Sequence, residues 1–265
     1  MQTFPPIITL ITDFGLDDPY VGQMKGALLS GCPQATLVDI SHAVCPWDIH
    51  AAAVTLATSY DSFPLGTIHL VVVDPGVGSE RGMIAAQGNG HFFVCPDNGI
   101  LSLLLEEEKM VEAHQLDAQP PGRTISPTFH GRDIMAPAAA ALAKGKTLAS
   151  LGNALHISKL KRLAFPLAQP DKAETPGRVL SIDHFGNVRT TIRAASNLDN
   201  QPCMQRVEIC GQILTTFANN YAQVEKGALL VLVDSAGFLE IAANQASAAA
   251  LLGCGPGDPV TLFCL

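Results

Sequence analysis

Residues 68 to 82, IHLVVVDPGVGSERG, are the most informative stretch of the chain. The run from Ile68 to Val73 is apolar and β-branched, which is typical of a buried strand. Asp74 stands where this strand ends, and the glycines and proline after it require a tight turn that leads to Arg81. A carboxylate and a guanidinium on a glycine-rich loop at a strand end indicate a site for chemistry, unless they form a simple exposed ion pair.

Apolar runs alternate with helical patterns through the first 160 residues. Strands are expected at 7–11, 35–40, 68–73 and 91–95, and helices at 19–29, 48–60, 98–106 and 133–143. This alternation predicts the α/β class, because a helix that follows each strand covers a face of the sheet. We therefore expect a three-layer N-terminal domain over residues 1–162 with a mostly parallel sheet.

The composition changes at residues 163–176, where three prolines and mixed charge predict a linker. Beyond it the helical periodicity nearly vanishes. Strands are expected at 178–182, 188–192, 206–210, 213–217, 229–233, 238–242 and 259–263. Short strands at this spacing, with glycines between them, predict a smaller C-terminal β-barrel domain over residues 177–265.

Charge and cysteine content narrow the class of protein. The net charge of −8 and the isoelectric point near 5.4 argue against a nucleic-acid binder. No apolar run reaches membrane-spanning length, and the N-terminus lacks the basic segment of a signal peptide. The 7 cysteines form no CxxC pair, so we expect reduced thiols in a cytoplasmic protein and no metal site.

Several acids follow the first expected strand. Asp13 stands directly after it, and Asp17 and Asp18 come close behind. In an open parallel sheet this is the edge where ligands bind, and carboxylates there hold a ribose diol, a cation or a positively charged substrate. Asp18 precedes Pro19 and so has the alternative role of a helix N-cap, whereas Asp13 has no capping role.

Two aromatic residues with polar neighbours offer further candidates. His130 lies between Phe129 and Gly131, before an alanine-rich helix pattern. A lone histidine is often structural, but this loop position also suits a proton-transfer or binding role. Trp47 is the single tryptophan. It either packs in the core or forms an aromatic wall for a planar ligand.

The second domain contains two polar turns. Asp183, Phe185 and Asn187 fall in the stretch DHFGN. A turn does not require the phenylalanine, while an aromatic ring beside an amide suits stacking on a purine and hydrogen bonding to its edge. Ser235 lies in a similar turn and either binds a carboxylate or caps the turn.

Seven motifs now fall in order along the chain. They are TDFG (12–15), PWD (46–48), DPGVGSERG (74–82), PDNG (96–99), FHGRD (129–133), DHFGN (183–187) and SAGFLEIAANQAS (235–247). In this register the chain resembles the S-adenosylmethionine hydroxide adenosyltransferases, the hydrolytic relatives of the fluorinating and chlorinating enzymes. The resemblance covers residues from about 7 to about 263.

The resemblance implies an activity and an assembly. Members of this family split S-adenosyl-L-methionine into adenosine and methionine without a cofactor. They have an α/β N-terminal domain and a smaller β-barrel domain, and they form homotrimers. Each active site of such a trimer lies between the N-terminal domain of one subunit and the C-terminal domain of a neighbour.

The resemblance also implies roles for individual residues. The catalytic triad of the family falls on Asp74, Arg81 and His130, which favours water over halide because the halogenating relatives lack this acid and this histidine. The positions matching substrate contacts are Asp13, Asp18, Trp47, Asp183, Phe185, Asn187 and Ser235.

Each substrate contact has an implied partner. Asp13 and Trp47 would contact the ribose. Phe185 and Asn187 would receive adenine, and the methionine ammonium and carboxylate would bind at the remaining C-terminal positions, Asp183 and Ser235. Tyr20 and Ala236 stand where the halogenases have a serine and an arginine, so the binding of the carboxylate is left open.

Two other functions compete with hydrolysis of S-adenosylmethionine. Calcium-dependent nucleoside hydrolases also begin with a strand that ends in clustered aspartates, but Ile11 stands where their first acid is expected. A non-catalytic sensor of adenosyl ligands would keep the binding motifs and would have no use for the triad.

Overall fold

The protein is described by a computed structural model that covers residues 5–119, 124–165, 167–170, 173–194 and 204–264. Its contacts divide the chain into two compact units, Met1–Ala164 and Phe165–Leu265. The expected linker at 163–176 spans this division, and its residues 166, 171 and 172 lie outside the described residues, as does Cys203. Strand β8 (Glu174–Ile182) begins inside that expected linker.

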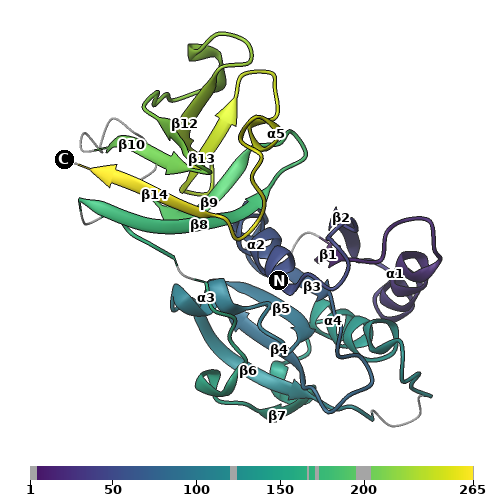
Figure 1. The fold of residues 1–265 in the computed structure, drawn as a ribbon. Helices are drawn as coiled ribbons and strands as arrows, with labels where there is room; N and C mark the ends of the chain where they lie inside the picture. The colour runs from purple at the N-terminus through teal and green to yellow at the C-terminus, as the bar shows by residue number, and fades with distance from the viewer. Residues whose placement is uncertain (1–4, 120–123, 166, 171–172, 195–203, 265) are drawn as a thin grey trace. The chain divides into compact units, whose positions relative to one another are not determined.

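The N-terminal unit is built on a 7-stranded mixed sheet (Figure 1). Across the sheet the strands are β2 (Thr36–Ser41), β1 (Ile7–Thr12), β3 (Ile68–Val72), β5 (His91–Pro96), β4 (Met83–Gly88), β6 (Met110–Leu116) and β7 (Gly152–Ala154). The first four strands pair in parallel, and the other pairings are antiparallel. The prediction of a mostly parallel sheet is therefore wrong for half of the sheet.

The antiparallel half begins at a hairpin that the sequence interpretation missed. Asn89 and Gly90 link β4 to β5, and both have positive φ, 48° and 79°. Positive φ at two successive turn residues is the signature of a type I′ hairpin, for which Asn-Gly is a favoured pair. The turn therefore makes β4 and β5 antiparallel. The sequence of β4 has no regular alternation of apolar and polar residues, so it could not be told from a loop.

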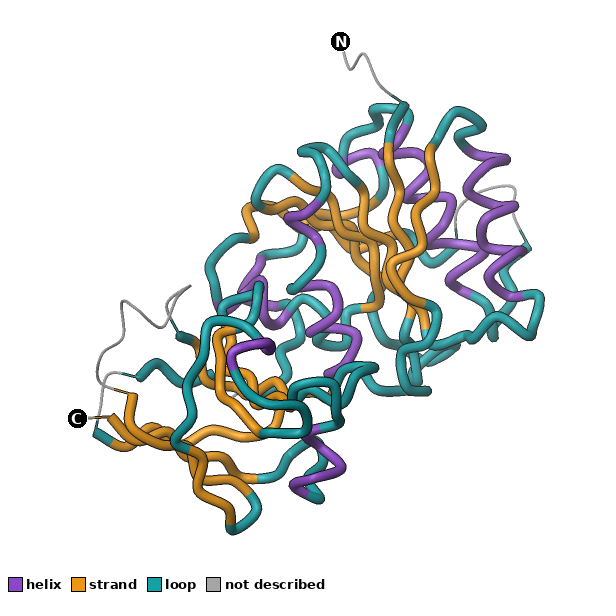
Figure 2. The backbone as a smooth tube through the Cα atoms, turned by 90° about the horizontal axis from the view of Figure 1, so that it is seen from above, coloured by secondary structure: helices purple, strands orange, loops and turns teal. Residues whose placement is uncertain are grey.

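Helices flank the sheet of this unit (Figure 2). They are α1 (Tyr20–Gly31), α2 (Ile49–Ala57), α3 (Ser102–Glu106), the π-helical turn η2 (Gly131–Met135), α4 (Ala136–Ala143) and the short 3₁₀ helices η1 (Tyr60–Ser62), η3 (Leu148–Ser150) and η4 (Ile157–Lys159). The predicted N-cap of α2 is confirmed, because Oδ1 of Asp48 accepts the Ala51 N–H at 2.9 Å.

Two apolar clusters cover the two faces of this sheet. Leu70 and Val72 of β3 pack with residues of α1 and α4, while Val71 and Val73 pack with residues of α2 and α3. Successive side chains of a strand point to opposite faces, so the clusters lie on either side of the sheet. The expected three layers are thus present in the N-terminal unit.

Pairing of β1 with β3 determines where the candidate site forms. The two strands are parallel, with Thr12 opposite Val72. Asp13 and Asp74 follow these strands and therefore emerge at the same edge of the sheet. Asn98 of the PDNG motif supports this edge by donating from Nδ2 to the Val73 carbonyl at 2.9 Å.

The C-terminal unit is a 7-stranded antiparallel sheet that curls into a barrel-like form. Its strand order is β11 (Gln212–Leu214), β10 (Met204–Ile209), β14 (Pro259–Cys264), β8, β9 (Val188–Arg193), β13 (Phe238–Ala243) and β12 (Leu229–Val233). The predicted strands of this unit are confirmed, except that the one expected at 213–217 ends at Leu214. Helix α5 (Ala248–Leu252) and the short helix η6 (Tyr221–Gln223) were not predicted.

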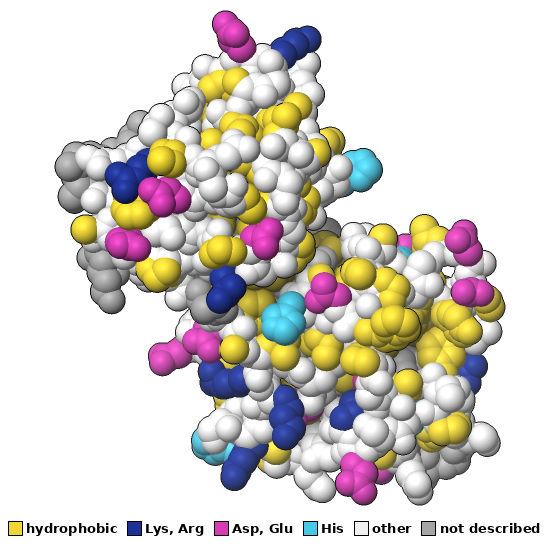
Figure 3. Space-filling view, viewed as in Figure 1, with side chains coloured by type: hydrophobic (Ala, Val, Ile, Leu, Met, Phe, Trp, Pro, Cys, Tyr) yellow, Lys and Arg dark blue, Asp and Glu magenta, His cyan; other side chains and the backbone are white. Residues whose placement is uncertain are grey.

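The surface carries both signs of charge, and acidic and basic side chains are interspersed on the face that Figure 3 shows. Among the residues with a described position, no helix has both the length and the apolar character needed to cross a membrane.

Candidate active site

Asp74, Arg81 and His130 lie in contact. Nε of Arg81 donates to Oδ1 of Asp74 at 2.7 Å, and Nη2 of Arg81 donates to its Oδ2. The same Nη2 lies 3.1 Å from Nδ1 of His130. The side chains of Arg81 and Asp74 are only 10% and 5% exposed. The sequence interpretation expected these three groups to converge from two loops, and the structure brings them together.

The contact with Arg81 determines the protonation of His130. Burial, and then the positive charge of Arg81, lowers the pKa of His130 below its ordinary value of 6.5. Arginine has only donors, so Nδ1 of the imidazole acts as an acceptor and the neutral ring carries its proton on Nε2. At neutral pH the Nε2–H of this histidine can therefore donate to a ligand or a water molecule.

Unused hydrogen-bonding capacity is present beside this pair. Nη1 of Arg81 is buried and has no partner among the described residues. Buried donors of this kind are normally paired, and a small polar molecule would supply an acceptor. A carboxylate has about four lone-pair sites, so Asp74 also keeps acceptor capacity after binding Arg81.

A glycine contact lets the two loops approach. At Gly78, φ is +80°, and a Cβ atom there would lie 2.5 Å from the Pro127 carbonyl oxygen. Any other residue would push the Asp74–Arg81 loop away from the loop that carries His130. Gly131 is less tight, because a Cβ atom there would lie 3.0 Å from the Val72 side chain.

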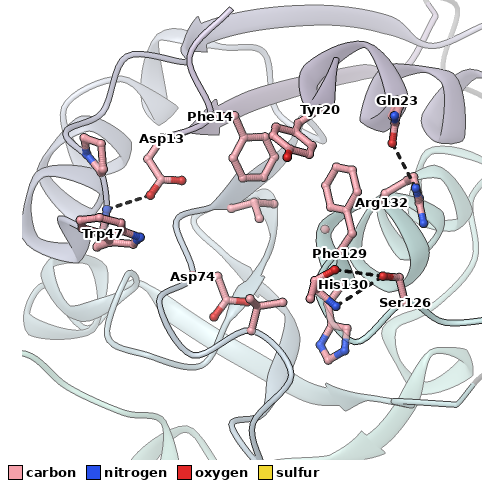
Figure 4. Close-up of a pocket in the computed structure, with 15 residues that line it drawn as sticks. Asp13, Phe14, Tyr20, Gln23, Trp47, Asp74, Ser126, Phe129, His130 and Arg132 are labelled. Atoms are coloured by element: carbon pink, nitrogen blue, oxygen red, sulfur yellow. Dashed lines mark hydrogen bonds between the residues drawn. The ribbon is translucent and has the colours of Figure 1, made fainter. Parts of the chain in front are cut away.

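Asp74 and His130 line a cavity of about 560 Å³. Its volume is within the range of about 300–1,000 Å³ for small-molecule sites. Asp13 and Trp47 line one side of it (Figure 4). The backbone N–H of Trp47 donates to Oδ2 of Asp13 at 2.8 Å, so Asp13 has a structural role that the sequence did not reveal. Trp47 is 73% exposed and has a positive φ of 65°, which is uncommon for a bulky residue.

A buried histidine supports the strand end before Asp13. Nδ1 of His42 lies 2.7 Å from Oγ1 of Thr12, which also accepts the Phe14 N–H. The His42 carbonyl accepts the Gly15 N–H at 2.8 Å, and its Nε2 lies 3.1 Å from Asp39. These contacts hold the loop that carries Asp13 at Thr12 before it and at Phe14 and Gly15 after it. The sequence interpretation missed His42 because its partner stands 30 residues away.

Three aromatic rings form part of the cavity lining. Phe14, Tyr20 and Phe129 contact one another edge to face, with ring centroids 5.5 to 6.0 Å apart. All three line the cavity. Such edge-to-face contacts hold the rings in defined orientations.

The C-terminal unit has its own cavity of about 660 Å³. Asp183, Phe185 and Asn187 line it, and Phe185 is 74% exposed. Oδ1 of Asp183 accepts the N–H groups of Phe185 and Asn187, while Oδ2 accepts from the Asn187 side chain. Asp183 therefore shapes the turn that presents the other two side chains.

Tyr221 also lines this second cavity and was not predicted. Its hydroxyl donates to Oε1 of Glu240 at 3.0 Å. Glu240 is buried, and burial raises its pKa. Burial, and then the charge of Glu240, raises the pKa of Tyr221 to about 12. The phenol is therefore a permanent donor at neutral pH.

Two predicted substrate contacts lie apart from these cavities. Asp18 and Ser235 are both exposed and line neither the N-terminal nor the C-terminal cavity. Within the described ranges, no group of three or more His, Cys, Asp or Glu side chains is arranged to hold a metal ion.

The fold and the cavity define the class of protein: an α/β domain with a cavity at the strand ends, followed by a barrel-like domain. Residues 8–152 match the N-terminal domain of the SAM hydroxide adenosyltransferases, and residues 177–261 match their C-terminal domain. The chain belongs to this family, which confirms the resemblance seen in the seven motifs.

Named relatives match along almost the full chain. An (R)-S-adenosyl-L-methionine hydrolase of Salinispora tropica is 40% identical over 257 residues, 96% of each chain. The hydrolase of the same name from Thermus thermophilus is 38% identical and covers 97% of this chain and 99% of its own. A fluorinase of Actinopolyspora mzabensis matches less closely, at 30% identity over 92% of each chain.

A solved structure has the same fold. The crystal structure of an uncharacterized conserved protein from Thermotoga maritima is similar with a TM-score of 0.87 and 34% sequence identity. The similarity covers 97% of this chain and 99% of that one.

Proposed function

We propose that this chain hydrolyses S-adenosyl-L-methionine to adenosine and L-methionine by in-line attack of water or hydroxide on ribose C5′. The contact of Asp74, Arg81 and His130 at the cavity is the observation that carries the proposal. Family membership and the names of the hydrolase relatives support the same reaction.

The chemistry needs a positioned nucleophile more than an acid. The substrate is a sulfonium, so methionine leaves as a neutral thioether and needs no protonation. A water molecule that donates to Asp74 and accepts from Nε2–H of His130 would have a lone pair left for the ribose carbon. Arg81 orients both partners of that water. Carboxylates are weak bases, so we infer that the proton passes to Asp74 as the carbon–oxygen bond forms.

The other predicted residues have proposed binding roles. Asp13 suits the ribose hydroxyls, beside the exposed ring of Trp47. Phe185 and Asn187 suit stacking on adenine and hydrogen bonding to its edge. The resemblance assigns the methionine ammonium and carboxylate to Asp183 and Ser235, and it gives Asp18 as a further substrate contact.

Assembly and location are also proposals. The binding groups are divided between two units, and the resemblance implies a homotrimer in which a neighbouring chain supplies the C-terminal groups. Sedimentation velocity of the pure protein tests whether it has the mass of a trimer. The expected cytoplasmic location rests on the reduced thiols, and Cys32, Cys45 and Cys95 form no disulfide.

One incubation tests the reaction. Pure protein with S-adenosyl-L-methionine should release adenosine and methionine, and Asp74→Ala and His130→Ala should each lower turnover by at least ~100-fold. Chromatography separates adenosine from halo-adenosine and free ribose when chloride or Ca²⁺ is added. Release of ribose with Ca²⁺ would favour a nucleoside hydrolase, and binding without turnover would favour a sensor.

A further inference from the structure

Tyr20, Gln23 and Arg132 line the cavity on the side away from Asp13 and Trp47 (Figure 4). In that view Asp74 lies between the two sides. A substrate whose ribose is held at Asp13 and whose reacting carbon lies near Asp74 would extend its other end toward this group. If the proposed function is correct, that end is the amino-acid half of the sulfonium.

The three side chains come from two elements. Tyr20 and Gln23 are three residues apart in α1 and therefore share one face of the helix. Arg132 lies in η2, and its Nη1 donates to Oε1 of Gln23 at 3.0 Å. This hydrogen bond joins residues 109 positions apart in the sequence.

Arg132 is held rigidly. Its Nε donates to Oδ1 of Asp133 at 2.6 Å, and its Nη2 donates to Oδ2 at 2.9 Å. Oδ2 of Asp133 is anchored in turn by the Ser126 N–H at 2.9 Å. The guanidinium also lies over the Phe129 ring, 4.9 Å from its centroid. A guanidinium fixed on three sides loses little further freedom when it binds a ligand.

The charge of Arg132 is paired with Asp133, and the side chains that line the cavity here leave several donors unused. A guanidinium has five N–H groups, and three of those of Arg132 are used by Asp133 and Gln23. The acceptor oxygen of Gln23 faces Arg132, so the Gln23 amide nitrogen is left to donate. The Tyr20 hydroxyl has no hydrogen-bond partner among the described residues, and Tyr20 is 46% exposed. A set of N–H and O–H donors around a guanidinium matches a carboxylate.

We propose that Tyr20, Gln23 and Arg132 form the subsite for the α-carboxylate of the substrate's methionine half. The proposal rests on the proposed function, and it accounts for a carboxylate that Ser235 and Ala236 leave without a cation. The subsite selects substrates that carry a carboxylate at this distance from the sulfonium. A sulfonium nucleoside without one binds less tightly.

The test compares two substrates. Decarboxylated S-adenosylmethionine keeps the sulfonium and the amine and lacks only the carboxylate. The wild-type protein should prefer S-adenosylmethionine by about tenfold or more in kcat/KM, the effect expected of a hydrogen bond to a charged group. Gln23→Leu and Tyr20→Phe should each reduce this preference, mainly by raising KM for S-adenosylmethionine.

Matched variants keep the result interpretable. Gln34→Leu makes the same change at an exposed glutamine outside the cavity and should keep the wild-type preference. Arg132→Lys keeps the positive charge and removes the planar set of guanidinium N–H donors. It should therefore lose the preference for S-adenosylmethionine even if Arg132→Ala fails to fold.

The outcomes separate the two proposals. Equal use of both substrates by the wild-type protein, or an unchanged preference in both Gln23→Leu and Tyr20→Phe, overturns the subsite and leaves the hydrolase proposal intact. Failure of the wild-type protein to release adenosine from either substrate overturns the proposed function itself.

Discussion

Replacing Asp74 and Arg81 singly and together should separate their structural and catalytic contributions. Both side chains are almost fully buried, at 5% and 10% exposure. In Asp74→Leu the guanidinium is left buried without a counter-ion, and in Arg81→Met the carboxylate is. Breaking a buried ion pair on one side costs about 3–5 kcal/mol of stability. Each single variant should therefore be destabilised by about that amount.

The double variant, Asp74→Leu with Arg81→Met, should behave differently. It leaves no unpaired charge, and an apolar pair in place of a buried ion pair is often neutral for stability. Its free energy of unfolding should exceed that of either single variant. Its turnover should stay at least ~100-fold below wild type, because the proposed proton acceptor is gone.

Urea unfolding followed by circular dichroism measures the stabilities, and chromatography of adenosine measures turnover. Glu208→Leu provides the control, because it breaks an exposed ion pair. The side chains of Glu208 and Arg206 are 41% and 40% exposed, so the loss of stability should be about 0–1 kcal/mol. Additive destabilisation in the double variant would refute the buried-pair reasoning, and recovery of turnover in it would remove Asp74 from the reaction.

Two further predictions concern other parts of the N-terminal unit. Burial, and then the neighbouring His91, lowers the pKa of His69 from 6.5 to about 3. The unfolded chain therefore takes up a proton at a higher pH than the folded chain. As the pH falls from 6.5 toward about 3, the free energy of unfolding should decrease by about 1.4 kcal/mol per pH unit. Urea midpoints between pH 7 and pH 4 check this slope, which a His69→Asn variant should lose. Gly78→Ala should cost about 1–3 kcal/mol and reduce turnover, because its Cβ would meet the Pro127 carbonyl at a positive φ; Gly22→Ala, with open space around it in α1, should stabilise by about 0.5–1 kcal/mol. Equal effects of the two glycine changes would contradict the close approach of the loops.

Local patterns in the sequence predicted much of the fold. The strand of residues 68–73 and the N-cap Asp48 carry their own signals, an apolar β-branched run and a side-chain acceptor before a helix. The antiparallel half of the first sheet was missed although Asn89 and Gly90 carry a hairpin signal. A run such as Met83–Gly88 can pair in either direction, and only the turn determines which.

The candidate site shows the same limit. Asp74 and Arg81 follow a recognisable strand pattern and His130 precedes a recognisable helix pattern, but only the family resemblance implied that the three side chains meet. The bond between Arg132 and Gln23 spans 109 residues, and no local pattern encodes it. Glu240 lies within a strand whose residues are all buried, where the sequence gives no sign that its partner is Tyr221.

The register of β1 against β3 has a consequence for how such enzymes diversify. Asp13 follows strand β1, and the loop of Asp74 and Arg81 follows the neighbouring strand β3. With the ribose bound at Asp13, as proposed, substitutions in the loop of Asp74 and Arg81 would change the attacking species and leave the ribose contact unchanged. A scaffold with this separation offers a short mutational route between cleavage by water and capture of another nucleophile.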